Sequence, residues 1–125
     1  MDKINLTIPK KSEYISTIRL TCSALSNLNG FNVDEIEDIK VIISEVCTFF
    51  ISNINQNNDP FDIKFMIDEN KLTVEVTDLN SGEISEENRT NSDMCILIIE
   101  SLADNYNFDL ENKKIIFEKC LNNNW

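Results

Sequence analysis

The 125-residue chain has no histidine, two glycines, two prolines and one tryptophan. Its four cysteines, Cys22, Cys47, Cys95 and Cys120, include no CxxC pair, so the usual zinc-binding patterns are absent. Each cysteine falls within an apolar stripe, which predicts buried free thiols in a reducing compartment. Disulfides are the alternative that the pattern leaves open.

Basic residues are also scarce, with 11 lysines and arginines against 22 acidic residues and a net charge of −11. This balance excludes nucleic acid as a direct partner and disfavours an anionic membrane surface. It favours partners with basic surfaces, unless the acidic residues serve only solubility. No apolar run approaches the roughly 20 residues that span a bilayer, and residue 1 leads directly into a charged segment without signal-peptide character. We therefore expect a cytoplasmic protein.

The apolar pattern predicts one domain over residues 1–125 with the order β-α-α-β-β-α-β-β. Alternating residues predict strands at 4–8, 61–67, 72–76, 106–110 and 115–121, with Glu69-Asn70 as a hairpin turn. Ser12 is a candidate cap for a first helix that ends at Gly30, and Asn32 with Glu35 forms a capping box for a second. Residues 94–102 suit a buried helix after a mobile loop at 79–93. Three helices on one face of a mostly antiparallel sheet make a two-layer α+β sandwich.

Three stretches, residues 14–22 (YISTIRLTC), 34–40 (DEIEDIK) and 43–48 (ISEVCT), resemble the anti-sigma-factor serine kinases of the RsbW type, within the GHKL or Bergerat-fold ATPases. Residues 100–104 (ESLAD) are similar to the family's helix after the ATP lid. The resemblance implies a homodimer that binds a sigma factor. It also implies phosphorylation of a serine on an antagonist protein with ATP and magnesium.

The chain departs from this family at its nucleotide site. Glu45 matches the family's general base, but Phe49 replaces the asparagine that holds magnesium, and a phenyl ring offers no oxygen ligand. Asp78 matches the adenine-binding aspartate, yet the glycines expected after it are reduced to Gly82. The lid stretch at residues 92–95 has no glycine, and its Asp93 would repel phosphates. Residues 112–114 (NKK) replace the family's Gly-Thr in the last hairpin.

These losses predict that the chain does not bind Mg-ATP and needs no cofactor. We expect Phe49 to pack against the lid helix near Met94, Leu97 or Ile98, closing the cleft. Glu45 and Asp78 would then be remnants of the catalytic and adenine-binding residues.

Arg19 matches a first-helix arginine that contacts sigma factor and antagonist in the family, and its position suggests an exposed face with Ser12, Ser16, Ser23 and Ser26. The leading hypothesis is therefore a non-catalytic regulator that binds a sigma factor or an anti-anti-sigma protein. An active ATP-dependent protein serine kinase, and a dimerisation subunit for an intact kinase, are the alternatives.

Overall fold

The computed structural model describes residues 1–53, 60–79 and 93–121. Its elements are β1 (Asp2–Ile8), the short 3₁₀ helix η1 (Ser12–Tyr14), α1 (Ile15–Leu28), α2 (Val33–Asn53), β2 (Phe61–Asp68), β3 (Lys71–Asp78), α4 (Asp93–Leu102), β4 (Asn105–Asp109) and β5 (Lys114–Cys120). The predicted order of strands and helices is confirmed. Of the predicted mobile loop at 79–93, residues 80–92 lie outside the described residues.

The described strands form one antiparallel sheet in the order β1-β2-β3-β5-β4. The β2–β3 hairpin pairs Asp68 with Lys71, so Glu69 and Asn70 form the predicted two-residue turn. Along β2 the alternate residues from Phe61 to Ile67 are buried, because successive side chains of a strand point to opposite faces.

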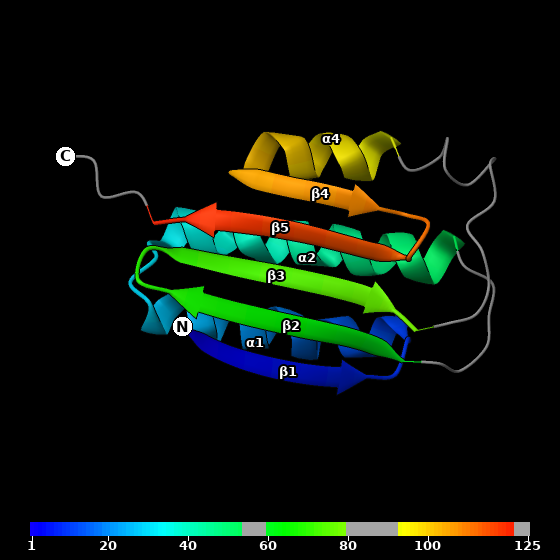
Figure 1. The fold of residues 1–125 in the computed structure, drawn as a ribbon, viewed down its shortest axis with the longest axis horizontal. Coiled ribbons are helices and arrows are strands. Elements are labelled where there is room, and N and C mark those ends of the chain that lie inside the picture. The colour runs from blue at the N-terminus through cyan, green and yellow to red at the C-terminus, as the bar shows by residue number, and fades with distance from the viewer. Residues whose placement is uncertain (54–59, 80–92, 122–125) are drawn as a thin grey trace.

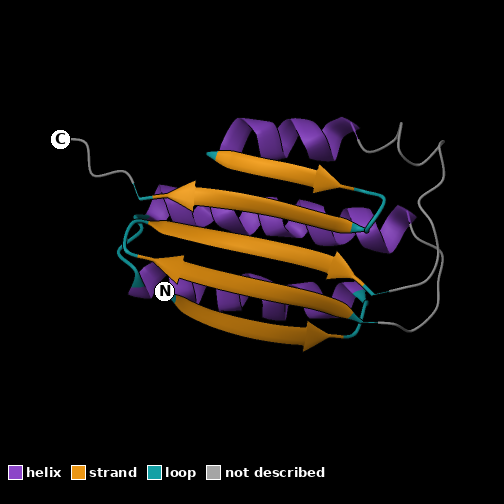
Figure 2. Ribbon diagram, in the orientation of Figure 1, coloured by secondary structure: helices purple, strands orange, loops and turns teal. Residues whose placement is uncertain are grey.

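The helices cover one face of this sheet (Figures 1 and 2). Helix α1 lies behind β1 and β2, α2 lies behind β3 and β5, and α4 packs against α2 and β4 (Figure 1). Large apolar side chains fill the space between the layers, with Phe50, Phe65 and Phe117 wholly buried. The opposite face carries polar side chains and ion pairs such as Lys114 with Glu75 at 3.1 Å. The architecture is the two-layer α+β sandwich that the sequence predicted.

The turn between α1 and α2 forms as expected. Gly30 has a φ of +85°, a left-handed conformation that disfavours other residues, and its amide donates to the Asn27 carbonyl at 3.3 Å. The amide of Glu35 donates to Asn32 Oδ1 at 2.8 Å, and the amide of Asn32 donates to Glu35 Oε1 at 2.9 Å. This reciprocal pair is the predicted capping box, and it satisfies two backbone donors that the helix leaves unpaired.

Two local predictions were wrong. Ser12 does not cap α1, because it lies in η1, and α1 begins at Ile15 without a side-chain cap. Helix α4 is not buried throughout, since Met94 is 66% exposed and Leu97 57% exposed. It lies at the margin of the helix layer (Figure 1), so only one stripe, which includes Cys95 and Ile99, faces the core.

Candidate functional site

Helix α2 carries Glu45 and Phe49 one turn apart, facing α4. Glu45 is half-exposed, and its backbone carbonyl accepts a hydrogen bond from Cys95 Sγ at 3.6 Å. Burial, followed by the negative charge of Glu45, raises the pKa of the Cys95 thiol to about 12. The thiol therefore stays protonated at neutral pH and acts as a packing group between the two helices.

Phe49 is buried, with 5% of its surface exposed, and its ring meets the ring of Phe50 edge-on at 5.4 Å. It lines a narrow apolar hollow whose other walls are Cys95, Ile96, Phe108, Leu110 and Ile115. No part of this hollow admits a water-sized sphere.

Phe49 therefore reaches α4 through Cys95 and Ile96, as the first turn of that helix faces α2. The prediction of Met94 or Leu97 as its neighbours was wrong, because both side chains point to solvent. Ile98 is half-buried and does not line the hollow.

Asp78 ends β3 with its side chain completely buried. One carboxylate oxygen accepts a hydrogen bond from Lys10 Nζ at 3.0 Å, and the Lys10 side chain is only 5% exposed. The Asp78 amide donates to the carbonyl of Lys113 at 2.9 Å. Lys113 has a φ of +54°, a left-handed conformation that residues other than glycine adopt infrequently.

Arg19 is exposed on α1 and lines a second hollow of about 250 Å³. The other lining residues are Ser16, Leu20 and Ser23 of α1 and Lys40 of α2. Lys40 Nζ donates to Glu37 at 2.8 Å, and Leu20 is 70% exposed. Among the described helices α1, α2 and α4, only Arg19 and Lys40 are basic, so both helical cations converge on one hollow.

The predicted surroundings of Arg19 need one correction. Ser16 and Ser23 lie beside it, but Ser26 is wholly buried and its hydroxyl donates to the Cys22 carbonyl at 2.6 Å. Ser26 follows Cys22 by four residues and therefore shares the core-facing side of α1.

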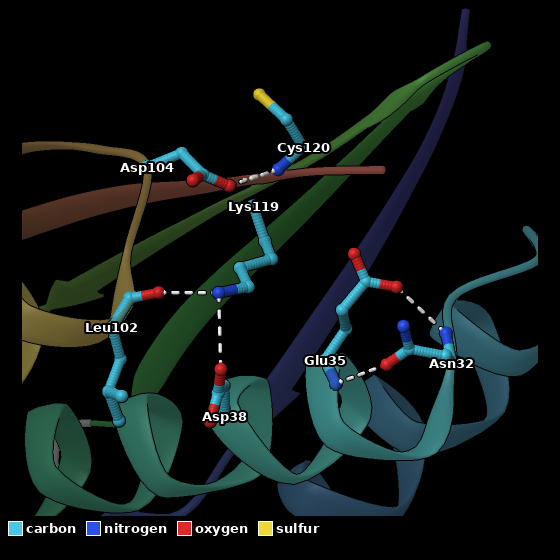
Figure 3. Close-up of polar contacts among 7 residues, drawn as sticks. All are labelled: Asn32, Glu35, Asp38, Leu102, Asp104, Lys119 and Cys120. Carbon is cyan, nitrogen blue, oxygen red and sulfur yellow. Dashed lines mark hydrogen bonds and ion pairs between the residues drawn. The ribbon is translucent and has the colours of Figure 1, made fainter. Parts of the chain in front are cut away.

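A third hollow, of about 560 Å³, lies where α2 begins and α4 and β5 end (Figure 3). Lys119 donates to Asp38 at 3.3 Å and to the Leu102 carbonyl at 2.7 Å, and Asp104 accepts from the Cys120 amide at 2.6 Å. These contacts join α2, α4 and β5, so the polar side chains drawn in Figure 3 hold the ends of three elements together.

The described parts of the chain contain neither a candidate metal site nor a candidate membrane-spanning helix. Within residues 1–53, 60–79 and 93–121, no group of three or more Cys, Asp or Glu side chains is arranged to hold a metal ion. Among the helices that the structure describes, none is long and apolar enough to cross a membrane.

The chain belongs to the histidine kinase-like ATPase domain family, whose model matches residues 8–119. Curated relatives include the serine-protein kinase RsbW of Halalkalibacterium halodurans, 34% identical over 77 residues. The serine-protein kinase RsbW of Bacillus thuringiensis (strain Al Hakam) is 40% identical over 78 residues. These alignments cover 62% of this chain but 48% and 49% of the two relatives, so the chain spans about half the length of the relatives that it matches.

Sequence inspection found Arg19, Glu45, Phe49 and Asp78 but missed the two lysines beside them. Lys40 follows Arg19 by 21 positions, and only the packing of α1 against α2 brings the two together. Lys10 could have been found, because it follows β1, and the antiparallel order β1-β2-β3 places the end of β1 at the same end of the sheet as Asp78.

Proposed function

We propose that this chain is a non-catalytic regulator that binds a protein partner and does not bind Mg-ATP. By analogy with the RsbW-type family, the partner is a sigma factor or an anti-anti-sigma protein. The observation that carries the proposal is the burial of Phe49 in an apolar hollow between α2 and α4, at the position of the family's metal-holding amide.

Magnesium does not fit the side chains around Phe49. The ion requires oxygen ligands in near-octahedral geometry, whereas the hollow is walled by apolar side chains and excludes water. Glu45, one turn earlier, is the nearest carboxylate on the same face of α2. One carboxylate without the amide provides a poor magnesium site, so we derive no catalytic step through the ion.

The aspartate that would bind adenine already forms an ion pair with a lysine of this protein. Asp78 would have to accept the amino group of adenine, but its buried carboxylate already accepts from Lys10. The ion pair of Asp78 and the missing amide beside Glu45 support the proposal that both residues are remnants of a nucleotide site.

The partner-binding surface that we propose is the hollow around Arg19. Arginine is enriched among residues that dominate binding energy, and here Lys40 and the exposed Leu20 lie beside it. Because Lys40 is already paired with Glu37, Arg19 beside the exposed leucine suits a partner segment that combines an acidic side chain with an apolar one. This surface is separate from Asp78 and Phe49, so it does not require nucleotide.

A protein serine kinase is the second candidate. It is favoured by the names of the relatives, which are serine-protein kinases, and by the retention of Glu45 and Asp78. A dimerisation subunit that pairs with an intact kinase is the third, and the mass of mixtures with candidate kinases would reveal it.

Isothermal titration calorimetry with ATP, ADP and magnesium at millimolar concentration tests the nucleotide part. We expect no saturable heat and no thermal stabilisation, because any ligand bound to the folded state would raise the melting temperature. Saturable binding with a dissociation constant tighter than roughly 100 µM, about −5.5 kcal/mol, would restore the kinase as the first candidate.

The partner-binding part is tested with Arg19→Ala against a protein captured from native cytosol and then purified. Removal of an exposed side chain should change stability by no more than about 0.5 kcal/mol, whereas loss of a binding hot spot costs about 2 kcal/mol or more. Affinity should therefore fall about 30-fold at an unchanged melting temperature. Lys64→Ala, on the opposite face of the molecule, is the matched control. Equal affinities of Arg19→Ala and wild type would remove Arg19 from the interface.

A further inference from the structure

Helix α4 presents apolar side chains to solvent. Met94 and Leu97 are mostly exposed, and Ile98 is half-buried. These three residues are spaced three and one positions apart, so they lie on one side of the helix, away from the core-facing Cys95 and Ile99. Single exposed apolar residues are ordinary on protein surfaces, whereas a contiguous group of them marks a contact site.

The neighbouring helix α2 adds Val41, which is 43% exposed. Val41 lies three residues after Asp38 and four before Glu45, on the same side of α2, and both of these positions are linked to α4. The Lys119 ammonium donates to Asp38 and to a carbonyl in the last turn of α4. The Cys95 thiol, in the first turn of α4, donates to the Glu45 carbonyl. Helix α4 therefore runs antiparallel to α2, with Val41 midway along their contact. We define the α4 stripe as Met94, Leu97, Ile98 and Val41.

The surroundings of the α4 stripe are acidic. Helix α2 carries five acidic residues and one lysine, and α4 carries two acidic residues and no basic one. Where α2 begins and α4 ends, the stripe leads to the hollow of about 560 Å³ whose polar contacts Figure 3 shows. The charged residues that line this hollow are Asp34, Glu35, Asp38, Asp104 and Lys119. Asp34 is exposed, and its carboxylate forms no hydrogen bond or ion pair with another described residue. A cation that enters the hollow therefore meets an excess of negative charge.

We propose that the α4 stripe and this hollow together form a docking surface for a basic amphipathic helix of a partner protein. The partner helix lays its apolar side on the stripe and places a lysine or arginine side chain in the hollow. Opposite charges favour this occupant, and they disfavour a second copy of this chain, which carries −11. The surface lies on the other side of α2 from the Arg19 hollow (Figure 1), so the inference is independent of the proposed function.

A synthetic peptide tests the chemistry of the occupant. The probe is a fluorescein-labelled helix of roughly five turns, with leucines spaced three and four residues apart and lysine at the other positions. Fluorescence anisotropy at about 0.15 M salt should show saturable binding to the full chain. One control peptide has serine for each leucine, and another has glutamate for each lysine. Both should bind at least about tenfold more weakly, because each keeps only one of the two kinds of contact. Absence of saturable binding, or equal affinity for the serine peptide, overturns the proposal.

Two double variants of the protein test the position of the α4 stripe. Met94→Ser with Leu97→Ser removes two solvent-facing side chains of the stripe, so the melting temperature should hardly change. The matched control, Leu20→Ser with Leu28→Ser, removes two exposed leucines of α1. The stripe variant should bind the lysine peptide at least about tenfold more weakly, while the control should bind like wild type. Equal affinities of the two variants overturn the proposal. A lower mass of the stripe variant in sedimentation velocity also overturns it, because the stripe then binds a second copy of the chain.

Asp34→Asn tests the hollow. It removes one negative charge at an exposed position, so affinity for the lysine peptide should fall about threefold or more and depend less on salt. Glu111→Gln, in the turn before β5 and at the opposite end of that strand from the hollow, is the matched control. Unchanged affinity of Asp34→Asn refutes the placement of a cation in the hollow. Arg19→Ala should bind the peptide like wild type. Loss of peptide binding by Arg19→Ala refutes this inference, whereas unchanged binding of its natural partner refutes only the proposed function.

Discussion

Replacement of Phe49 by asparagine restores the residue that the ATP-binding family uses at this position, and it should harm the protein without restoring nucleotide binding. Phe49 is 95% buried and contacts the ring of Phe50, so removing its ring creates a cavity in a packed region. Truncation of a core phenylalanine costs about 3–5 kcal/mol, and a buried amide without partners adds about 1–3 kcal/mol. Globular domains have only about 5–15 kcal/mol in total, so the variant should be marginally stable.

The assay is thermal unfolding of wild type, Phe49→Asn and the control Phe49→Leu. For a chain of this size about 3–5 °C is lost per kcal/mol, so Phe49→Asn should melt at least 10–20 °C lower. Phe49→Leu keeps an apolar side chain and should lose only about 1 kcal/mol. The difference between the variants isolates the cost of placing an amide in the hollow.

Two results would refute this reasoning. If the free energy of unfolding of Phe49→Asn lies within about 1 kcal/mol of the wild-type value, the hollow already tolerates a polar group and is not a closed apolar contact. If Phe49→Asn acquires saturable Mg-ATP binding in calorimetry, the phenyl ring alone blocks the site, and the missing lid glycines matter less than we infer.

Further predictions concern the buried ion pair and the buried thiols. Lys10→Met should cost about 3–5 kcal/mol, because it leaves the Asp78 carboxylate buried beside an apolar side chain, and adding Asp78→Asn should recover most of this loss. Urea unfolding of the wild type, both single variants and the double variant measures this recovery of stability. Equal stabilities of Lys10→Met and the double variant would contradict the prediction. Burial raises the pKa of the Cys22 thiol to about 12, so this thiol is protonated in the folded state while the unfolded chain ionises near 9.0. The free energy of unfolding should therefore fall above pH 9 by about 1.4 kcal/mol per pH unit from this thiol. Cys22→Ala should remove this contribution to the pH dependence of the free energy of unfolding. An unchanged pH dependence would exclude Cys22 as its source.

The sequence predicted the fold well because each layer is encoded by local patterns. Alternation in β2 and β3, the Glu69-Asn70 turn and the Asn32–Glu35 capping box depend on neighbours within a few positions, and all three are confirmed. Where local patterns allow more than one outcome, prediction was weaker. Ser12 has the chemistry of a cap, but the chain turns through η1 before α1 begins.

The candidate site was predictable only in part, since its residues were recognised singly and not as pairs. Apolar content indicated that Phe49 is buried, but which side of α4 it meets depends on the rotation of that helix, so Met94 and Leu97 were chosen wrongly. The ion pair of Lys10 with Asp78 joins positions 68 residues apart. Such a contact follows from strand order, which no single segment of sequence specifies.

The distribution of the thiols has a practical consequence. Helices α1, α2 and α4 each contain one buried cysteine, at positions 22, 47 and 95. Each helix therefore carries an internal chemical label that becomes reactive only when that helix separates from the elements packed against it. Pulsed alkylation followed by peptide mass analysis would read the order in which the helix layer opens, without any introduced probe.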